Sequence, residues 1–167
     1  KFELAADFSE NFQGQTENGK ESMFAIQYSK DDGTPFGRIN MGQALVYPMN
    51  QEFGCCWQHI PSQNLVNAFK TGANGLPMFE HYDDFDVTEG DDFLDNSFDP
   101  RLDHTVAIPG HPWKYKPDFV YQKTWARAPA IYGYYTTLKG TVAPDDPTFQ
   151  KIPPFMSSSA NWQLIRF

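Results

Sequence analysis

The densest group of potentially reactive side chains in the chain is acidic. Residues 80–103 hold ten of the 21 Asp and Glu residues, and Arg101 is the only Lys or Arg among them. Carboxylate oxygens clustered in a loop are the ligands that Ca²⁺ prefers. The segment nevertheless lacks the EF-hand spacing, which needs a Glu at the twelfth position of the loop. We therefore interpret it as a solvated acidic loop without a metal site, with calcium binding as the alternative.

Paired carboxylates also suggest glycoside hydrolysis, in which two acids face the scissile bond. Asp95, Asp99 and Asp103 are close enough in sequence for that role. Catalytic acids need unlike environments that push their pKa values apart, and spacing alone does not provide them. The order Asp99, Pro100, Arg101 is more typical of a turn in which the carboxylate accepts from backbone amides and pairs with the guanidinium.

Other catalytic patterns are missing from the sequence. The four His residues show no HExxH spacing, no Ser lies in a GxSxG turn, and no Gly-rich phosphate loop is present. Cys55 and Cys56 are adjacent and lack CxxC spacing, so we interpret them as two small buried residues, with a disulfide between them as the alternative. The sequence predicts no catalytic residue, no metal and no cofactor.

Aromatic side chains remain as candidates for binding. The chain has 15 Phe, 8 Tyr and 4 Trp, which together exceed its Leu, Ile and Val residues. Tyr and Trp combine an apolar face with a polar group and suit half-open, wet surfaces. Residues alone leave two uses open: an aromatic-rich core, or exposed rings that stack on the C–H faces of sugars.

The net charge of −8 excludes some partners. A protein that binds nucleic acid or docks on an anionic lipid leaflet needs clustered Lys and Arg residues. No apolar run approaches the roughly 20 residues of a membrane span. We expect neither a nucleic-acid partner nor a membrane-spanning segment.

Few regular elements can position these side chains. Leu4, Phe8 and Phe12 recur at a spacing of four and predict a short helix. Residues 22–28 predict a strand, followed by a turn at 31–35. Residues 61–70 predict a helix, since Pro61 suits a first turn and Gly72 lies just past the end. Residues 101–108 predict a strand, and residues 132–138 a short helix or strand.

The second half of the chain leaves little room for long helices. Nine prolines lie between residues 100 and 154. Leu, Ile, Val and Phe total only 36 of the 167 residues, so we expect a partner scaffold, most simply further parts of the same polypeptide. Residues 161–167 look like the opening of an apolar element. We expect the chain to be one portion of a longer protein, with no internal domain boundary in residues 1–167.

Four stretches, in this order, resemble the SusD/RagB family of outer-membrane nutrient-binding lipoproteins. They are residues 18–29 (NGKESMFAIQYS), 61–70 (PSQNLVNAFK), 99–106 (DPRLDHTV) and 161–167 (NWQLIRF). The resemblance implies a mainly α fold with long irregular loops and a few short strands. Residues 1–167 would be its central to C-terminal portion, with most of the tetratricopeptide-like flanking helices, the signal peptide and the lipid-anchor Cys outside this chain.

The resemblance also implies a function. Such a protein binds oligosaccharides or polysaccharides on the outer face of a bacterial outer membrane, without catalysis, and delivers them to a SusC-like TonB-dependent transporter. It would meet the membrane only through a lipid anchor. The glycan contacts of the family are mostly aromatic and lie in variable loops, so no fixed motif transfers. From this sequence we predict Trp57, Trp113 and Tyr115 as glycan-binding residues, with Trp125 behind them. A secreted acidic glycoside hydrolase using carboxylates near Asp95–Asp103 and a purely structural module remain the alternatives.

Overall fold

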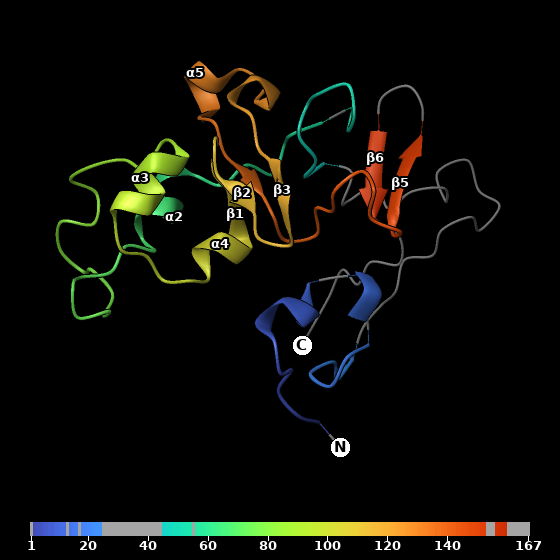
Figure 1. Cartoon of the computed structure of the whole chain (residues 1–167), viewed down its shortest axis with the longest axis horizontal. Coiled ribbons are helices and arrows are strands. Elements are labelled where there is room, and N and C mark those ends of the chain that lie inside the picture. Colours follow the sequence, from blue (N-terminus) through green and yellow to red (C-terminus); the bar gives the residue numbers. More distant parts are fainter. Residues whose placement is uncertain are drawn as a thin grey trace.

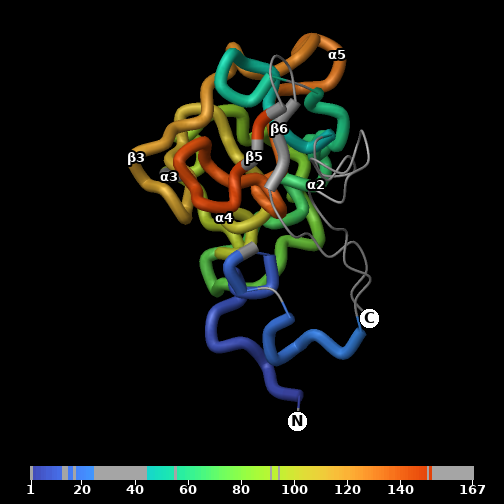
Figure 2. The backbone as a smooth tube through the Cα atoms, turned by 90° about the vertical axis from the view of Figure 1, so that its right-hand side faces the viewer, coloured from blue at the N-terminus to red at the C-terminus, as the bar shows by residue number. Residues whose placement is uncertain are grey.

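The chain folds into a largely irregular structure with short helices and small sheets. The computed structural model describes residues 2–12, 14–16, 18–24, 45–54, 56–152 and 156–159, the side chains of 14, 91, 94, 150, 152 and 156–159 excepted. Residues 2–24, at the blue end of the chain, lie on one side of the remaining body in both views (Figures 1 and 2). Within the described ranges no helix is long and apolar enough to cross a membrane.

The helices have at most six residues in the described part of the chain. Two 3₁₀ helices come first, η1 (Phe8–Asn11) and η2 (Gly14–Thr16). The α-helices are α2 (Gln63–Asn67), α3 (Gly90–Asp95), α4 (Leu102–Thr105) and α5 (Pro129–Tyr132), and the 3₁₀ helix η3 (Lys123–Trp125) lies before α5. Helices this short are marginal by themselves, so tertiary packing must hold them.

Three two-stranded antiparallel sheets complete the fold (Figure 1). β1 (Val106–Ala107) pairs with β4 (Thr136–Thr137), with Val106 opposite Thr137. β2 (Pro112–Trp113) pairs with β3 (Lys116–Val120), and a register shift follows Pro112. β5 (Phe149–Ile152) pairs with β6 (Met156–Ser159).

Helix α2 confirms the prediction of a helix within residues 61–70, but it is shorter. The Ser62 hydroxyl caps its start by accepting from the Leu65 amide at 3.1 Å, so Pro61 lies before the helix rather than in its first turn. Past its end, Lys70 pairs with Phe98 in an isolated β-bridge. Strand pairing therefore replaces the last predicted helical turn.

The strand predicted over residues 101–108 is wrong in its first half. The Leu102 amide donates to the Asp99 carbonyl at 2.9 Å, and the Thr105 hydroxyl donates to the Arg101 carbonyl. These bonds wind the chain into α4, and only Val106–Ala107 continue as a strand. The prediction of a short helix or strand over residues 132–138 is met only in its strand form, because α5 (Pro129–Tyr132) ends where the range begins and β4 covers Thr136–Thr137.

The N-terminal apolar stripe forms a 3₁₀ helix instead of an α-helix. Phe8 and Phe12 contact each other with ring centroids 5.1 Å apart, but Leu4 is exposed. Asp7 caps this helix by accepting from the Ser9 amide at 2.8 Å. Residues 22–24 are not in a strand, and the remainder of the predicted strand 22–28, the turn 31–35 and the run 161–167 lie outside the described residues.

Two buried clusters form the core, and β1 separates them. Ala107 belongs to a cluster rich in aromatic rings, which contains Tyr47, Phe53, Trp113, Tyr121, Leu138 and Ala143. Its neighbours Val106 and Ile108 belong to the other cluster, which contains Val66, Val87, Leu102 and Tyr135. Successive residues of a strand point to opposite faces, so one extended segment supplies both clusters.

Tyr135 connects distant segments inside the second cluster. Its carbonyl accepts from Trp57 Nε1 at 3.0 Å. Its hydroxyl is shared between Gln63 Oε1, at 2.7 Å, and the carbonyl of Val87. Burial raises the pKa of Tyr135 to about 12, so the hydroxyl stays protonated and keeps donating.

The predicted fold class is confirmed in its irregular loops and few short strands. The mainly α content is not seen in the described residues, where the helices are short. Pro109, Pro112 and Pro117 lie in the stretch that would have to continue α4, and proline removes the backbone donor that a helix interior needs. The described portion is therefore held by turns and side-chain hydrogen bonds.

We expect Tyr135→Phe to lower the free energy of unfolding by about 1–3 kcal/mol, because it removes the donor to a buried carbonyl. Urea unfolding followed by circular dichroism measures the change. Tyr132→Phe is the matched control, since Tyr132 is 56% exposed, and it should shift stability by less than about 0.5 kcal/mol. Equal midpoints for Tyr135→Phe and the wild type would contradict the role given to this hydroxyl.

Candidate functional site

Two of the four predicted aromatic residues, Trp113 and Trp125, belong to one group of rings. Trp113 stacks on Phe53 with centroids 6.0 Å apart and meets Phe119 edge-on at 4.7 Å. Trp125 contacts Phe53 at 5.9 Å and Phe119 at 5.4 Å. Trp113 is only 3% exposed and Trp125 is half-buried. Both rings therefore pack in the core, with part of Trp125 reaching solvent.

Trp57 is joined to this group through its backbone, since its amide donates to the carbonyl of Tyr47, which packs on Phe53. Its side chain is 2% exposed, and its indole N–H is used by the Tyr135 carbonyl. Its backbone has a φ of 51°, in the left-handed region that bulky residues rarely adopt. It lines a pocket of about 700 Å³ together with Pro61, Arg127 and Tyr132, away from Tyr115. The structure thus does not bring the four predicted residues together on one surface.

Tyr115 is the member of the predicted set with an accessible ring, at 41% exposed. It lines a pocket of about 430 Å³, and Trp113 forms part of the wall. Two buried polar atoms on residues of this pocket, Trp113 Nε1 and Thr141 Oγ1, have no hydrogen-bond partner among the described residues. Both atoms are buried, so the accessible Tyr115 ring is the part of this set that a ligand in the pocket can contact.

Charged and amide groups surround this Tyr115 pocket. Lys116 forms an ion pair with Asp145 at 2.7 Å, and Gln15 Nε2 donates to Asp146 Oδ2 at 3.4 Å. The Tyr115 hydroxyl hydrogen-bonds to His104 Nδ1, which fixes the ring. An aromatic face with carboxylates and amides nearby is suited to a sugar, whose hydroxyls donate and accept.

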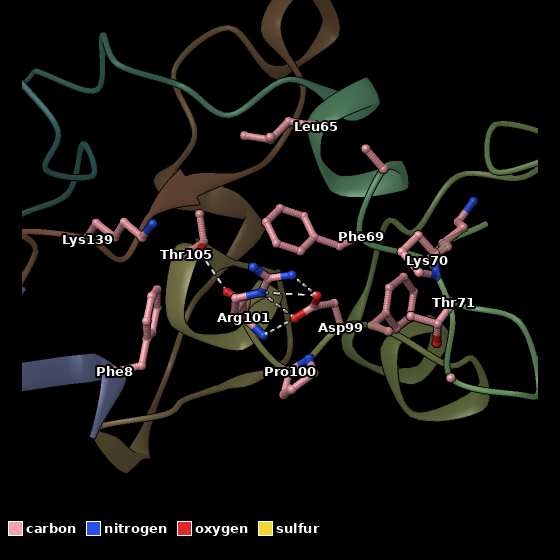
Figure 3. Close-up of a pocket in the computed structure, with 14 residues that line it drawn as sticks. Phe8, Leu65, Phe69, Lys70, Thr71, Asp99, Pro100, Arg101, Thr105 and Lys139 are labelled. Atoms are coloured by element: carbon pink, nitrogen blue, oxygen red, sulfur yellow. Dashed lines mark hydrogen bonds and ion pairs between the residues drawn. The ribbon is translucent and has the colours of Figure 1, made fainter. Parts of the chain in front are cut away.

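A third pocket, of about 700 Å³, lies around the 99–101 turn and is called the Lys139 pocket (Figure 3). Figure 3 shows Phe8 and Lys139 on one side of it and Lys70 and Thr71 on the other, with the 99–101 turn between them. Consecutive residues line this pocket and the Tyr115 pocket: Leu138 lines the Tyr115 pocket, and Lys139 lines the Lys139 pocket. Phe12 lines the Tyr115 pocket and Phe8 lines the Lys139 pocket, and the two rings contact each other.

The turn at residues 99–101, which lines the Lys139 pocket, is the one predicted from the sequence. Asp99 accepts from the Arg101 amide at 2.9 Å, and Arg101 Nε and Nη2 donate to both carboxylate oxygens (Figure 3). The hydrogen bond from the Arg101 guanidinium lowers the pKa of Asp99 to about 2. This confirms the capping and pairing expected for residues 99–101.

Asp103 is also held as an anion. His111 Nε2 lies 2.8 Å from Asp103 Oδ1, and Lys114 lies 3.5 Å from Oδ2. Burial by itself raises the pKa of Asp103, but the His111 hydrogen bond and the positive charges lower it further than burial raises it. Glycoside hydrolysis needs one carboxyl group with a raised pKa. The pKa values of Asp99 and Asp103 are both lowered instead, which argues against the hydrolase alternative.

The acidic segment is folded around a buried lysine. Lys70 is 1% exposed, and its ammonium donates to the carbonyls of Tyr82, at 2.8 Å, and Phe85. Desolvation lowers the pKa of Lys70, while the charges of Asp86, Asp83 and Asp84 oppose that shift. In the described part of the chain, no three His, Cys, Asp or Glu residues lie together as a metal site.

The cysteine interpretation needs a correction. Cys56 is disulfide-bonded, and Cys55 is the only other cysteine of the sequence. The interpretation of a small buried residue is therefore wrong for Cys56, which is disulfide-bonded and only half-buried. Adjacent cysteines can form such a bond only with a tightly turned backbone, which sequence spacing alone does not predict.

Sequence reasoning did not single out Lys139, Phe8 and Phe12, which line the pockets. The two Phe residues were assigned to a helix face from their spacing of four. Lys139 lies between Leu138 and Gly140 and had no distinguishing neighbour in the sequence. The structure places its ammonium over the Phe12 ring at 4.5 Å and near the Phe8 ring at 5.4 Å.

Comparison with known proteins gives one family. Residues 20–152, well over half of the chain, match the protein-family model described as the SusD family. This confirms the resemblance seen in the sequence. Comparison with curated proteins finds no match.

We expect Arg101→Gln to raise the pKa of Asp99 from about 2 toward the ordinary value of about 3.9. Because the folded pKa lies below the unfolded one, the pair stabilises the fold above about pH 4, and this contribution is lost as the pH falls toward 2. A ¹³C NMR titration of the Asp99 carboxyl measures the shift. Lys20→Gln, which removes the exposed pair with Glu3, is the control and should leave Asp99 unchanged. An Asp99 pKa that is unaltered in Arg101→Gln would contradict this assignment.

Proposed function

Because the chain belongs to the SusD family, we propose that it binds glycans at a bacterial cell surface without cleaving them. Membership of this family implies glycan binding in polysaccharide utilisation by non-catalytic proteins. The observation that carries the proposal is the family match over residues 20–152. The paired, ionised states of Asp99 and Asp103 support a role in binding rather than hydrolysis.

The Tyr115 pocket is the site that the geometry supports best. Its exposed ring offers a face to sugar C–H groups, and Asp145, Asp146 and Gln15 supply acceptors and an amide for hydroxyls. In this proposal Trp113 forms the wall of the pocket and Trp125 supports it through Phe119. Trp57 remains a predicted contact of a different pocket, beside Arg127 and Tyr132.

The delivery step belongs to the same proposal. We assign the protein to the exterior face of the outer membrane, held there by a lipid anchor, with tetratricopeptide-like helices around the described portion. Bound glycan would pass to a SusC-like TonB-dependent transporter. Family membership supports both the partner and the location.

A purely structural role is the second candidate. It is favoured by the burial of Trp57 and Trp113, which are only 2% and 3% exposed. Under this alternative the aromatic surplus serves packing alone. The two candidates differ in what removal of the Tyr115 ring does to glycan binding.

We expect Tyr115→Ala to weaken glycan binding about two- to tenfold, as loss of one aromatic contact costs on the order of 0.5–1.5 kcal/mol. Affinity electrophoresis through gels that contain a panel of plant, host and microbial polysaccharides identifies the glycan and measures the change. Tyr115→Phe should bind nearly as the wild type if the ring face makes the contact.

The matched control is Phe79→Ala, because Phe79 is 85% exposed and lines none of the pockets described above. It should migrate as the wild type does. Absence of retardation by every polysaccharide would overturn the proposed function and favour the structural role. If Tyr115→Ala is retarded as strongly as the wild type, the proposed function stands, but the binding site must lie outside the Tyr115 pocket.

A further inference from the structure

Lys139 is an unusual cation within the described part of the chain. It is half-buried, yet it makes no ion pair or hydrogen bond with any described residue. The other described cations that are not fully exposed have partners: Lys70 has two carbonyls, Lys116 has Asp145, and Lys123 has Glu89. Partial burial of a charge costs free energy, and the faces of Phe8 and Phe12 offset only part of that cost, so the ammonium can still pair with an anion that the described residues do not supply.

The surroundings of Lys139 are positive and aromatic. Its ammonium contacts the faces of Phe8 and Phe12, and Arg101 is the neighbouring charged group in the same pocket. Burial, and then the charge of Arg101, lowers the pKa of Lys139. Asp99, the single acid among the described residues that line this pocket, already accepts hydrogen bonds from Arg101 Nε and Nη2. A protein of net charge −8 therefore keeps a positive pocket with an uncompensated ammonium.

We propose that the pocket between Phe8, Arg101 and Lys139 is a subsite for the carboxylate of an acidic sugar, so that the glycan bound by this protein contains uronic or other carboxylate-bearing residues. Lys139 Nζ and Arg101 Nη1, which pairs with none of the described residues, would donate to the carboxylate, and the Phe8 ring, 38% exposed, would face the sugar ring. This inference rests on the proposed glycan-binding function and specifies its substrate class.

The position of this subsite agrees with a chain-like ligand. It adjoins the Tyr115 pocket through Phe8 and Phe12, and through the consecutive residues Leu138 and Lys139. One oligosaccharide can then contact Tyr115 with one sugar and place a neighbouring carboxylate at Lys139. Because the protein as a whole repels polyanions, binding of an acidic glycan requires a local positive site of this kind.

The test compares each acidic polysaccharide with its own neutral form. Polygalacturonate, alginate and hyaluronan are used before and after chemical reduction of their carboxyl groups to alcohols, together with neutral polysaccharides. We expect the wild type to bind at least one acidic polymer, and to bind its reduced form at least about tenfold more weakly. Lys139→Gln should lose this preference, Lys139→Arg should keep it, and added salt should weaken binding of the acidic form only.

Lys151→Gln is the matched control, since Lys151 is exposed, donates to the Gln51 carbonyl and lies in none of these pockets. Thermal melting of Lys139→Gln establishes that the variant is folded. Equal binding of acidic and reduced polymers, binding of neutral glycans alone, or an acidic preference that survives Lys139→Gln would overturn the subsite while leaving glycan binding intact. If Tyr115→Ala weakens binding of the acidic and the reduced forms alike, the result supports the proposed glycan site at Tyr115 and is independent of the Lys139 subsite. If no glycan binds to the wild type, both proposals fail.

Discussion

Pairing of buried polar groups by side chains is the constraint on which this structure depends. Helices of at most six residues and two-stranded sheets leave many backbone groups of the described chain without a regular partner. Such groups cannot remain unpaired once buried, so side chains must reach them. Tyr135 does so for Val87, Thr136 for Val46, and Lys70 for Tyr82 and Phe85. These bonds join segments that are 12 to 90 residues apart, and they hold the irregular loops in one arrangement.

Charge is compensated in the same local manner. The acidic segment turns around Lys70, α3 is capped by its own carboxylates, and Lys123 pairs with Glu89 at the start of that helix. Asp99 pairs with Arg101 and Asp103 with Lys114, both close in the chain. With these pairs formed, most of the net negative charge remains on the surface, and the region around Lys139 is left positive. A locally positive pocket on a protein of net negative charge can bind an anion selectively, because the rest of the surface does not attract anions.

Several features followed from the sequence for physical reasons that act over a few residues. The Ser62 cap, the helix after it and the Asp99 turn are local hydrogen-bonding patterns, and each lies where the residue types indicated. The same local reasoning failed at residues 101–105. Val106 and its neighbours favour a strand, but the turn bonds from Asp99 and Arg101 start a helix first. The tryptophans show the complementary limit: composition indicated many rings, and only packing decided that Trp57 and Trp113 are covered while Tyr115 is accessible.

The sequence by itself determined the family, through four short stretches in a fixed order, and the scarcity of long helices, through its prolines. Both are properties that neighbouring residues carry without help from the rest of the chain. Tertiary structure alone decided which rings face solvent, that Phe8, Phe12 and Lys139 meet across more than 120 residues, and that this lysine lacks an acidic partner in the described chain. Exposure and charge pairing are set by contacts between distant segments, and no residue type or spacing records them.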